Sequence, residues 1–279
     1  MRIGGLITPT WDESDLVMIG RPAKVPFLAG RTDIAAAYSM RRLSAAYTGP
    51  VLRARRASDN AEQDFSPASS FLTFSEVNTW AGGNAFATTF YDQSGGGRNL
   101  LQATTANQPQ IINAANSLPA LLFDGSNDVL ATGAFARTQP YAFNSVHRVV
   151  AAGSTYVLFD GLVNDTGQVY GSTGADTAVV YAGAGGVGLG TSTSIPIATR
   201  GAIGGTINGA SSLLEVNAAT IASFSGNAGA SNASGLTLGG RASTLLANME
   251  SQEFILFSTA HTQAQLQADN ASMRAAWGF

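Results

Sequence analysis

From about residue 86 onward, short apolar runs alternate with turn-forming residues. The runs are separated by clusters such as Ser94-Gly95-Gly96-Gly97 and Gly125-Ser126-Asn127-Asp128. A spacing of about ten residues between such runs is typical of a β-sandwich or barrel. We therefore expect short strands, together with an earlier one at 51–56, at 86–91, 109–112, 119–123, 146–150, 155–159, 178–182, 202–207, 212–216, 219–224, 235–238 and 252–258.

The pair Asn208-Gly209 lies between two of these runs and is the clearest hairpin signal in the chain. A two-residue type I′ turn needs a positive φ at both positions, and Asn-Gly supplies it. No fixed-period repeat is present, which disfavours a propeller or a β-helix.

Two segments have a helical pattern instead. Residues 33–47 combine an N-cap candidate, Asp33, with a rough apolar face and a stop at Gly49-Pro50, so they predict a short helix. At the other end, residues 262–277 predict an amphipathic helix that covers one end of the sandwich. Leu266, Met273 and Trp277 share one of its faces, interrupted by Asn270.

Residues 1–30 differ from the rest, with three prolines and no clear period. We interpret them as an extended N-terminal arm that precedes a single domain over residues 31–279. The arm is either a flap of the same domain or a peg that docks on a neighbouring subunit. Its isolated apolar side chains are the attachment candidates, namely Trp11, Met18 and Phe27.

Composition narrows the function classes. Of the 279 residues only 12% are charged, the net charge is -3, and cysteine is absent. There is no basic field for nucleic acid, and no disulfide or cysteine-ligated metal can form. No apolar run reaches the length of a membrane span, and the N-terminus lacks the apolar core of a signal peptide. We expect a protein made in the cytoplasm, without nucleic-acid or membrane partners.

Two segments carry a family resemblance. One is 36–60, which ends Leu-Arg-Ala-Arg-Arg-Ala-Ser-Asp-Asn60, and the other is 90–102, Phe-Tyr-Asp-Gln-Ser-Gly-Gly-Gly-Arg-Asn-Leu-Leu-Gln. Together they resemble the start of the arabinofuranosidase B catalytic domain, and phage virion proteins of the laminin-G or concanavalin type have similar stretches. The resemblance implies an all-β fold, a concanavalin/laminin-G-like antiparallel β-sandwich (jelly roll).

The resemblance also implies where catalytic carboxylates would lie. A retaining glycosidase needs two of them about 5 Å apart. In the family, the nucleophile is a Glu shortly after a Phe-Asp stretch, and the acid is an Asp after a strand ending Gly-Gly. Here the matching stretch, 158–167, contains no Glu, and Gly239-Gly240 is followed by Arg241. The resemblance therefore predicts the scaffold without the reaction, with no catalytic residue.

Side chains for glycan binding are proposed at Asp92, Tyr156, Asp160 and Tyr181. Asp92 could bind sugar hydroxyls or calcium, or it could cap its own glycine-rich loop as an Asx turn. The loop 124–128 has the same ambiguity between calcium and a plain turn. We expect no metal site and no cofactor, with calcium as the alternative.

Five arginines lie within residues 41–56. They could form a patch that binds anions or nucleic acid, or they could pair with acidic side chains of the same domain. Pairing with Asp59, Glu62, Asp64 and Asp92 is the favoured interpretation, because Arg forks match carboxylates.

The favoured function is a non-catalytic phage virion protein: a tail-fibre, head-fibre or decoration module. It would be homo-oligomeric, contact other virion proteins through its arm and bind a host surface glycan. One alternative is an arabinofuranosidase-like hydrolase with a relocated carboxylate among Asp92, Asp160 and Asp165. Another is a secreted bacterial lectin or adhesin.

Overall fold

The computed structural model describes residues 26–151, 155–172, 177–183, 187–188, 198–217, 221–242 and 244–279. Nearly all of its regular structure is antiparallel β. The strands are β1 (Ile34–Ser39), β2 (Leu52–Arg56), β3 (Glu62–Phe65), β4 (Ala85–Phe90), β5 (Leu100–Leu101), β6 (Gln110–Asn113), β7 (Pro119–Asp124), β8 (Leu130–Ala131), β9 (Ala136–Arg137), β10 (Tyr141–Ala151), β11 (Thr155–Asp160), β12 (Gln168–Ser172), β13 (Thr177–Tyr181), β14 (Val187–Gly188), β15 (Arg200–Ile207), β16 (Ser212–Asn217), β17 (Ile221–Gly226), β18 (Ala233–Ser234), β19 (Thr237–Leu238) and β20 (Asn248–Phe257).

Helices are few. The two α-helices are α1 (Phe74–Ala81) and α2 (Gln263–Trp277), and short 3₁₀ turns occupy η2 (Thr105–Asn107) and η3 (Gly209–Ser211). No helix of the described residues is long and apolar enough to cross a membrane.

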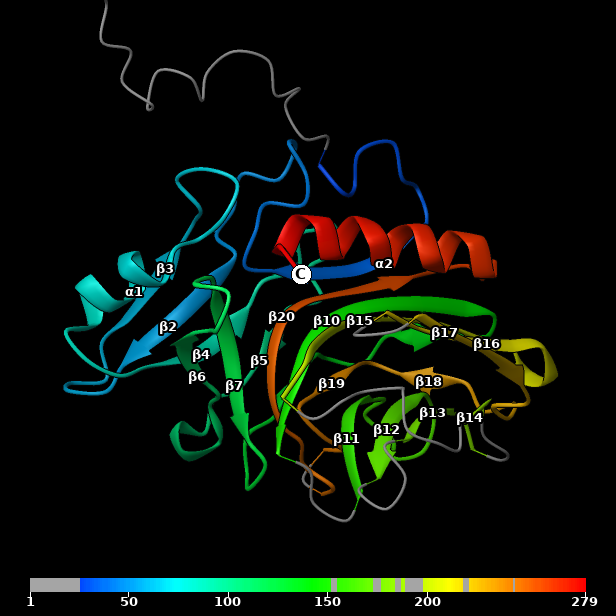
Figure 1. Ribbon diagram of the computed structural model, residues 1–279. Coiled ribbons are helices and arrows are strands. Elements are labelled where there is room, and N and C mark those ends of the chain that lie inside the picture. The colour runs from blue at the N-terminus through cyan, green and yellow to red at the C-terminus, as the bar shows by residue number, and fades with distance from the viewer. Residues whose placement is uncertain are drawn as a thin grey trace, which may run out of the picture.

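The strands form a two-layered sandwich (Figure 1). The first layer runs β1-β20-β10-β15-β16-β17, with every pair antiparallel. The second runs β3-β2-β4-β5-β8-β19-β11-β12-β13-β14. The layers are joined through β6 and β7, since β6 pairs with β4 and β7 pairs with β20. The predicted fold class is confirmed: an antiparallel β-sandwich with a C-terminal helix.

Aromatic rings connect the two layers in the core. Phe159 of β11 packs edge-on against Phe143 of β10 and Phe254 of β20, with ring centroids 4.7 Å apart in each pair. All three rings are buried. Edge-to-face packing of this kind contributes beyond the burial of apolar area alone.

Helix α2 is present as predicted, but it covers the outer face of β10, β15 and β16 and not one end of the sandwich (Figure 1). Its N-cap, Thr262, forms a capping box with Gln265, and Gly278 ends it in the left-handed conformation. Asn270, which interrupts the apolar stripe, is fully buried and accepts a hydrogen bond from Asn144 Nδ2 at 2.7 Å. A polar residue on that stripe is therefore a satisfied contact between helix and sheet.

Two local predictions were wrong. The segment 33–47 contains the strand β1, not a helix, because its alanines fit tightly beside β20, and that tertiary pairing overrides helix propensity. The hairpin between β15 and β16 exists, but η3 closes it and Asn208 has φ -152, so the turn is not type I′. Helix α1 was missed, although Thr73 and Glu76 form a capping box visible in the sequence.

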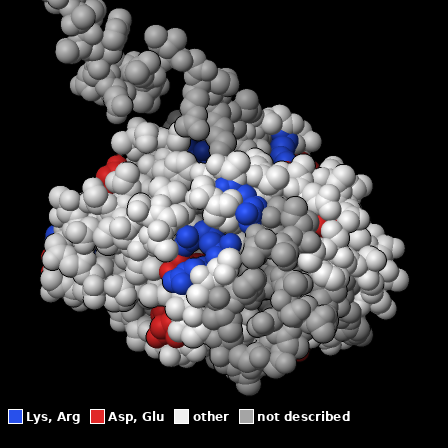
Figure 2. All heavy atoms as spheres, viewed as in Figure 1, with Lys and Arg blue, Asp and Glu red and all other residues white. Residues whose placement is uncertain are grey.

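Charge is sparse on the face seen in Figure 2, where basic and acidic side chains form a small group on a largely uncharged surface. Within the arginine cluster, Arg53 pairs with Asp64 and Arg56 with Asp59, as predicted. Arg41 instead reaches the buried Glu253 on β20.

Candidate functional site

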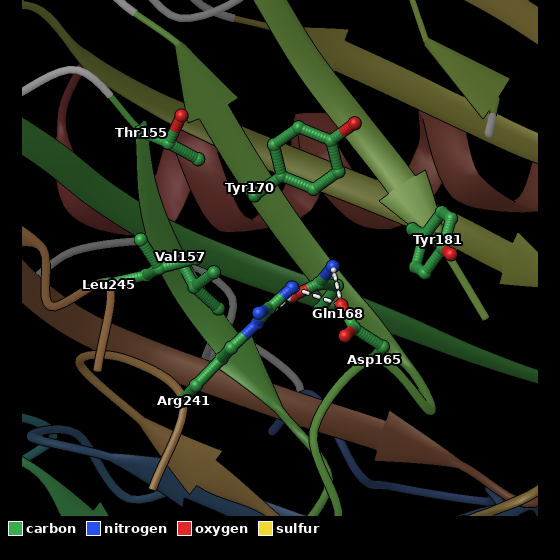
Figure 3. A pocket seen from close by; sticks show the side chains of 8 residues that line it. All are labelled: Thr155, Val157, Asp165, Gln168, Tyr170, Tyr181, Arg241 and Leu245. Carbon is green, nitrogen blue, oxygen red and sulfur yellow. Dashed lines mark hydrogen bonds and ion pairs between the residues drawn. The ribbon is translucent and has the colours of Figure 1, made fainter. Parts of the chain in front are cut away.

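A pocket of about 370 Å³ opens at one end of the second layer (Figure 3). Strands β11, β12 and β13 form one side of it, and the turn that follows β19 forms the other. Its lining mixes two aromatic rings, a carboxylate, an amide, a guanidinium and aliphatic side chains: Thr155, Val157, Asp165, Gln168, Tyr170, Tyr181, Arg241 and Leu245. A volume of this order is in the range of small-ligand sites.

The loop between β11 and β12 is organised by Asp160. The Asp160 carboxylate is fully buried and accepts backbone N–H groups from Gly161 at 2.7 Å, Asp165 at 2.8 Å and Gly167 at 3.2 Å. Burial raises the pKa of the Asp160 carboxyl, while these hydrogen bonds act in the opposite direction. The loop is thereby fixed so that the side chain of Asp165 lies at the pocket.

The opposite side of the pocket depends on Gly239 and Gly240. Gly239 has φ +98, and a Cβ there would lie 2.2 Å from the ring of Phe123. A Cβ on Gly240 would lie 2.5 Å from a methyl of Leu246. The positive φ and the close approach of the Phe123 ring require glycine at 239, in the turn that presents Arg241 to the pocket.

Asp165, Gln168 and Arg241 form one polar cluster (Figure 3). Arg241 Nη2 pairs with Asp165 Oδ1, and Arg241 Nε donates to Gln168 Oε1 at 3.0 Å. Gln168 Nε2 in turn donates to Asp165 Oδ1 at 3.0 Å. Arg241 Nε also lies 3.9 Å from Asp160 Oδ2. The Asp165 side chain remains 42% exposed, whereas that of Asp160 is enclosed.

The rings of Tyr170 and Tyr181 stand edge to face with centroids 6.5 Å apart. Both are half-buried and line the same pocket. Burial raises the pKa of the Tyr170 hydroxyl, so it stays protonated at neutral pH. Together the rings give the pocket an apolar wall with polar tips, a surface suited to the face of a sugar.

The structure separates the four residues proposed for glycan binding. Tyr181 lines the pocket, and Asp160 holds the loop that carries Asp165 to the pocket. Tyr156 is buried against Gly171 of β12, where a Cβ would lie 2.3 Å from its hydroxyl. Asp92 is elsewhere: it is buried and accepts N–H groups from Ala37, Ser94 and Arg98.

The attachment candidates are also separate from the pocket. Phe27 is buried beneath the guanidinium of Arg31, 4.5 Å from its ring centroid. Trp11 and Met18 lie outside the described residues.

Sequence reasoning did not propose Gln168 or Arg241 as binding residues. A signal for Arg241 existed, because the resemblance marks two segments, 158–167 and 239–241, as the positions of the catalytic groups. They are more than 70 residues apart in the chain, and the structure brings them together at one pocket. The tyrosines carried no such signal, since most aromatics in a sandwich belong to the core.

No group of three or more His, Asp or Glu side chains in the described ranges is arranged to hold a metal ion. In the loop 124–128, Asp124 Oδ1 accepts the N–H groups of Ser126 and Asn127, and Asp128 Oδ2 accepts that of Asp124. Both carboxylates therefore stabilise the turn itself.

The fold and the pocket together define a β-sandwich with an aromatic-walled, carboxylate-bearing site on strands β11, β12 and β13. The chain belongs to the α-L-arabinofuranosidase B catalytic family, whose family model matches residues 26–187. Among curated proteins, no relative matches.

Solved structures of the same fold include an arabinofuranosidase in complex with arabinofuranosyl-α-1,2-xylobiose, at TM-score 0.70 and 16% identity. A variant GH54 α-L-arabinofuranosidase soaked with 4-nitrophenyl α-L-arabinofuranoside matches at TM-score 0.71 and 15% identity. Each match covers 87% of this chain but only 62% and 63% of the other chain, respectively. This chain thus spans less than two thirds of the proteins it resembles.

These findings correct two expectations. The favoured function, a non-catalytic phage virion module, is wrong, because the family match is to a catalytic domain and the similar structures are arabinofuranosidases. The expectation of no enzyme is wrong for the same reason. Both errors came from treating the absence of a Glu in 158–167 and of an Asp after Gly239-Gly240 as the loss of the reaction. A carboxylate, that of Asp165, does line the pocket.

Proposed function

We propose that this protein is a glycoside hydrolase that accepts a terminal α-L-arabinofuranose unit in the pocket around Asp165. The convergence of the segments 158–167 and 239–241 on that pocket supports this proposal most directly. Family membership supplies the reaction class, and the lining supplies the chemistry.

The pocket has the features that recognition of a single sugar requires. Its volume of about 370 Å³ suits a monosaccharide, and Tyr170 and Tyr181 offer ring surfaces to the apolar face of a furanose. The polar groups of Asp165 and Arg241 line the same pocket as these rings. A sugar stacked on the rings would have its anomeric carbon within reach of the Asp165 carboxylate.

Asp165 is assigned as the attacking carboxylate, because it lines the pocket and is partly exposed. Its attack on the anomeric carbon would expel the aglycone oxygen and form a glycosyl-enzyme ester, which water then hydrolyses. Asp160 is assigned as a positioning residue, because its carboxylate is enclosed and holds the backbone of the loop.

The first test is release of 4-nitrophenol from 4-nitrophenyl α-L-arabinofuranoside. This leaving group departs without protonation, so the assay examines the attacking carboxylate alone. We expect saturable turnover by the native protein and a loss of at least about 100-fold in Asp165→Asn, the scale on which removal of a group acting in the transition state is felt.

Asp64→Asn is the matched control. Asp64 is likewise paired with an arginine, Arg53 Nε at 2.7 Å, and its side chain is 40% exposed. It lies on β3, at the far end of the sandwich from β11–β13 (Figure 1). Full activity in Asp64→Asn with loss in Asp165→Asn supports the assignment. No turnover by the native protein, or equal turnover in both variants, would overturn it.

A second substrate tests the aglycone. Arabinofuranosyl-α-1,2-xylobiose has a sugar leaving group that must be protonated on departure. If the native protein releases arabinose from it, a proton donor operates in the pocket as well. If turnover is confined to the nitrophenyl glycoside, the attacking carboxylate acts without one.

A further inference from the structure

A second pocket, of about 340 Å³, shares no lining residue with the first. It lies between the start of β1, the end of β20 and the segment around β9. Its lining contains two arginines, Arg98 and Arg137, together with Tyr141, and no carboxylate. The proposed hydrolase reaction does not use it.

Arg137 is the unusual residue of this pocket. It is only 3% exposed, yet none of its three guanidinium nitrogens has a hydrogen-bond partner within the part of the chain that the structure describes. Its guanidinium instead stacks 5.3 Å from the centroid of the Tyr141 ring. Burying a charge without hydrogen bonds costs free energy of folding, so such a group indicates that a ligand supplies the hydrogen-bond acceptors.

Tyr141 shares this condition. It is 2% exposed, and its hydroxyl also has no hydrogen-bond partner among the described residues. The two groups converge beside Gly167, where a Cβ would lie 2.1 Å from Tyr141 Oη and 3.3 Å from Arg137 Nη2. Several donor hydrogens on adjacent groups therefore remain without an acceptor.

The surrounding charges favour an anion. Arg98 lines the same pocket, with its guanidinium 4.6 Å from the centroid of the Phe135 ring. The carboxylate of Asp160 is close enough to Arg137 to interact electrostatically, but it is bonded to the backbone of its own loop. The pocket lining thus carries positive charge and no acid, and two of its residues, Arg137 and Tyr141, have buried donors with no partner among the described residues.

We propose that this second pocket binds a small oxyanion, a carboxylate or phosphate group, through the guanidinium of Arg137 and the hydroxyl of Tyr141. A planar guanidinium fork matches such oxygens with two parallel hydrogen bonds. The volume exceeds that of a bare ion, so the group can belong to an acidic monosaccharide.

The test needs no substrate of the hydrolase and so stands apart from the proposed function. Thermal unfolding of the native protein is followed against increasing acetate, inorganic phosphate and glucuronate at constant ionic strength, with calorimetric titration of each. A ligand that binds only the folded state raises Tm in a saturable way. We expect saturation with at least one of the three.

Three variants locate the effect. Arg137→Met should fold, because the Asp160 carboxylate keeps its backbone hydrogen bonds and methionine fills the buried space, and it should abolish the saturable rise. Tyr141→Phe keeps the ring and should weaken binding about tenfold, the value of one hydrogen bond to a charged group. Arg53→Met, a surface arginine paired with Asp64, is the control for general effects of salt and should behave as the native protein.

Tighter binding of glucuronate than of acetate identifies an acidic sugar as the ligand, and equal affinity identifies the bare oxyanion. Both results support the proposal. Absence of saturation with all three anions, or the same saturable rise in Arg137→Met, would overturn it.

Discussion

Arg241 and Asp165 form an ion pair at the wall of the first pocket, and Gln168 is hydrogen-bonded to both of them. The two charged residues come from segments far apart in the chain, the loop after β11 and the turn after β19. The pair fixes the orientation of the carboxylate that we assign to attack. Arg241 therefore acts through Asp165, as a positioning residue.

Replacing Arg241 with Met tests this relationship. We expect kcat for 4-nitrophenyl α-L-arabinofuranoside to fall about tenfold with little change in KM, because the sugar still binds but the carboxylate loses its fixed direction. The unfolding free energy should change by no more than about 1 kcal/mol, since the ion pair is partly exposed. Steady-state kinetics and urea unfolding measure the two effects.

Arg241→Lys is the conservative comparison. Lysine keeps the charge but cannot bond Asp165 and Gln168 at once as the guanidinium fork does, so it should restore kcat only in part. Unchanged kcat in Arg241→Met would show that Asp165 is positioned by other contacts.

Much of the fold could be predicted because the hydrophobic pattern and the tertiary structure agree. Strands such as β7 and β16, and the helix α2, lie where the apolar runs and the helical periodicity predicted them. The prediction failed at β1, whose alanines are compatible with either structure, so only the contacts with β20 decide.

The candidate site could be predicted only in part, for a different reason. Asp160 and Tyr181 were proposed, but what distinguishes Asp160 from Asp165 is burial, and burial depends on how the loop folds back on itself. Arg241 lies 76 residues from Asp165, and nothing local indicates that pairing. Resemblance to the family supplied the only link between the two segments.

Removal of Arg41, the buried partner of Glu253, should lower the unfolding free energy strongly. Arg41 Nε and Nη2 donate to the two oxygens of Glu253 at 2.6 and 2.7 Å, and both side chains are buried. Arg41→Met leaves that carboxylate enclosed with Ser39 and Trp277 as its remaining donors. We expect a loss of about 3 to 5 kcal/mol in the unfolding free energy, measured by denaturant titration.

The matched control for that change is Arg53→Met, which removes a half-exposed partner of Asp64 and should cost about 0 to 1 kcal/mol. The double variant Arg41→Met, Glu253→Met should recover most of the stability, since both buried charges are gone. Equal losses of unfolding free energy in Arg41→Met and Arg53→Met would contradict the expectation that the buried ion pair is the more costly one to break.

Replacing Gly239 with alanine should destabilise the turn after β19 by steric crowding. An alanine there combines a φ of +98 with a methyl 2.2 Å from the Phe123 ring, so we expect a loss of about 2 to 5 kcal/mol. Gly30→Ala is the control, because Gly30 has φ +72 with nothing within 4 Å and should cost only about 1 to 2 kcal/mol. Thermal and denaturant unfolding of both variants separate crowding from backbone strain.

Asp128 predicts a pH dependence of stability. Burial raises the pKa of this carboxyl from 3.8 to about 6. Between pH 3.8 and about pH 6 the folded protein keeps a proton on Asp128 that the unfolded chain releases. The contribution of Asp128 to the unfolding free energy is therefore full below about pH 4, and it is lost as the pH rises through 6. The difference in unfolding free energy between the native protein and Asp128→Asn, measured from pH 4 to pH 7, isolates this contribution.

Asparagine keeps an oxygen for the Asp124 N–H, which donates to Asp128 at 3.0 Å, so the turn should survive in Asp128→Asn while the pH dependence of this group disappears. Asp59→Asn is the control: a hydrogen bond from Arg56 holds the pKa of Asp59 at about 2, so its titration falls below this window. If the native protein and Asp128→Asn show parallel profiles from pH 4 to pH 7, the carboxyl of Asp128 is not held protonated by the fold.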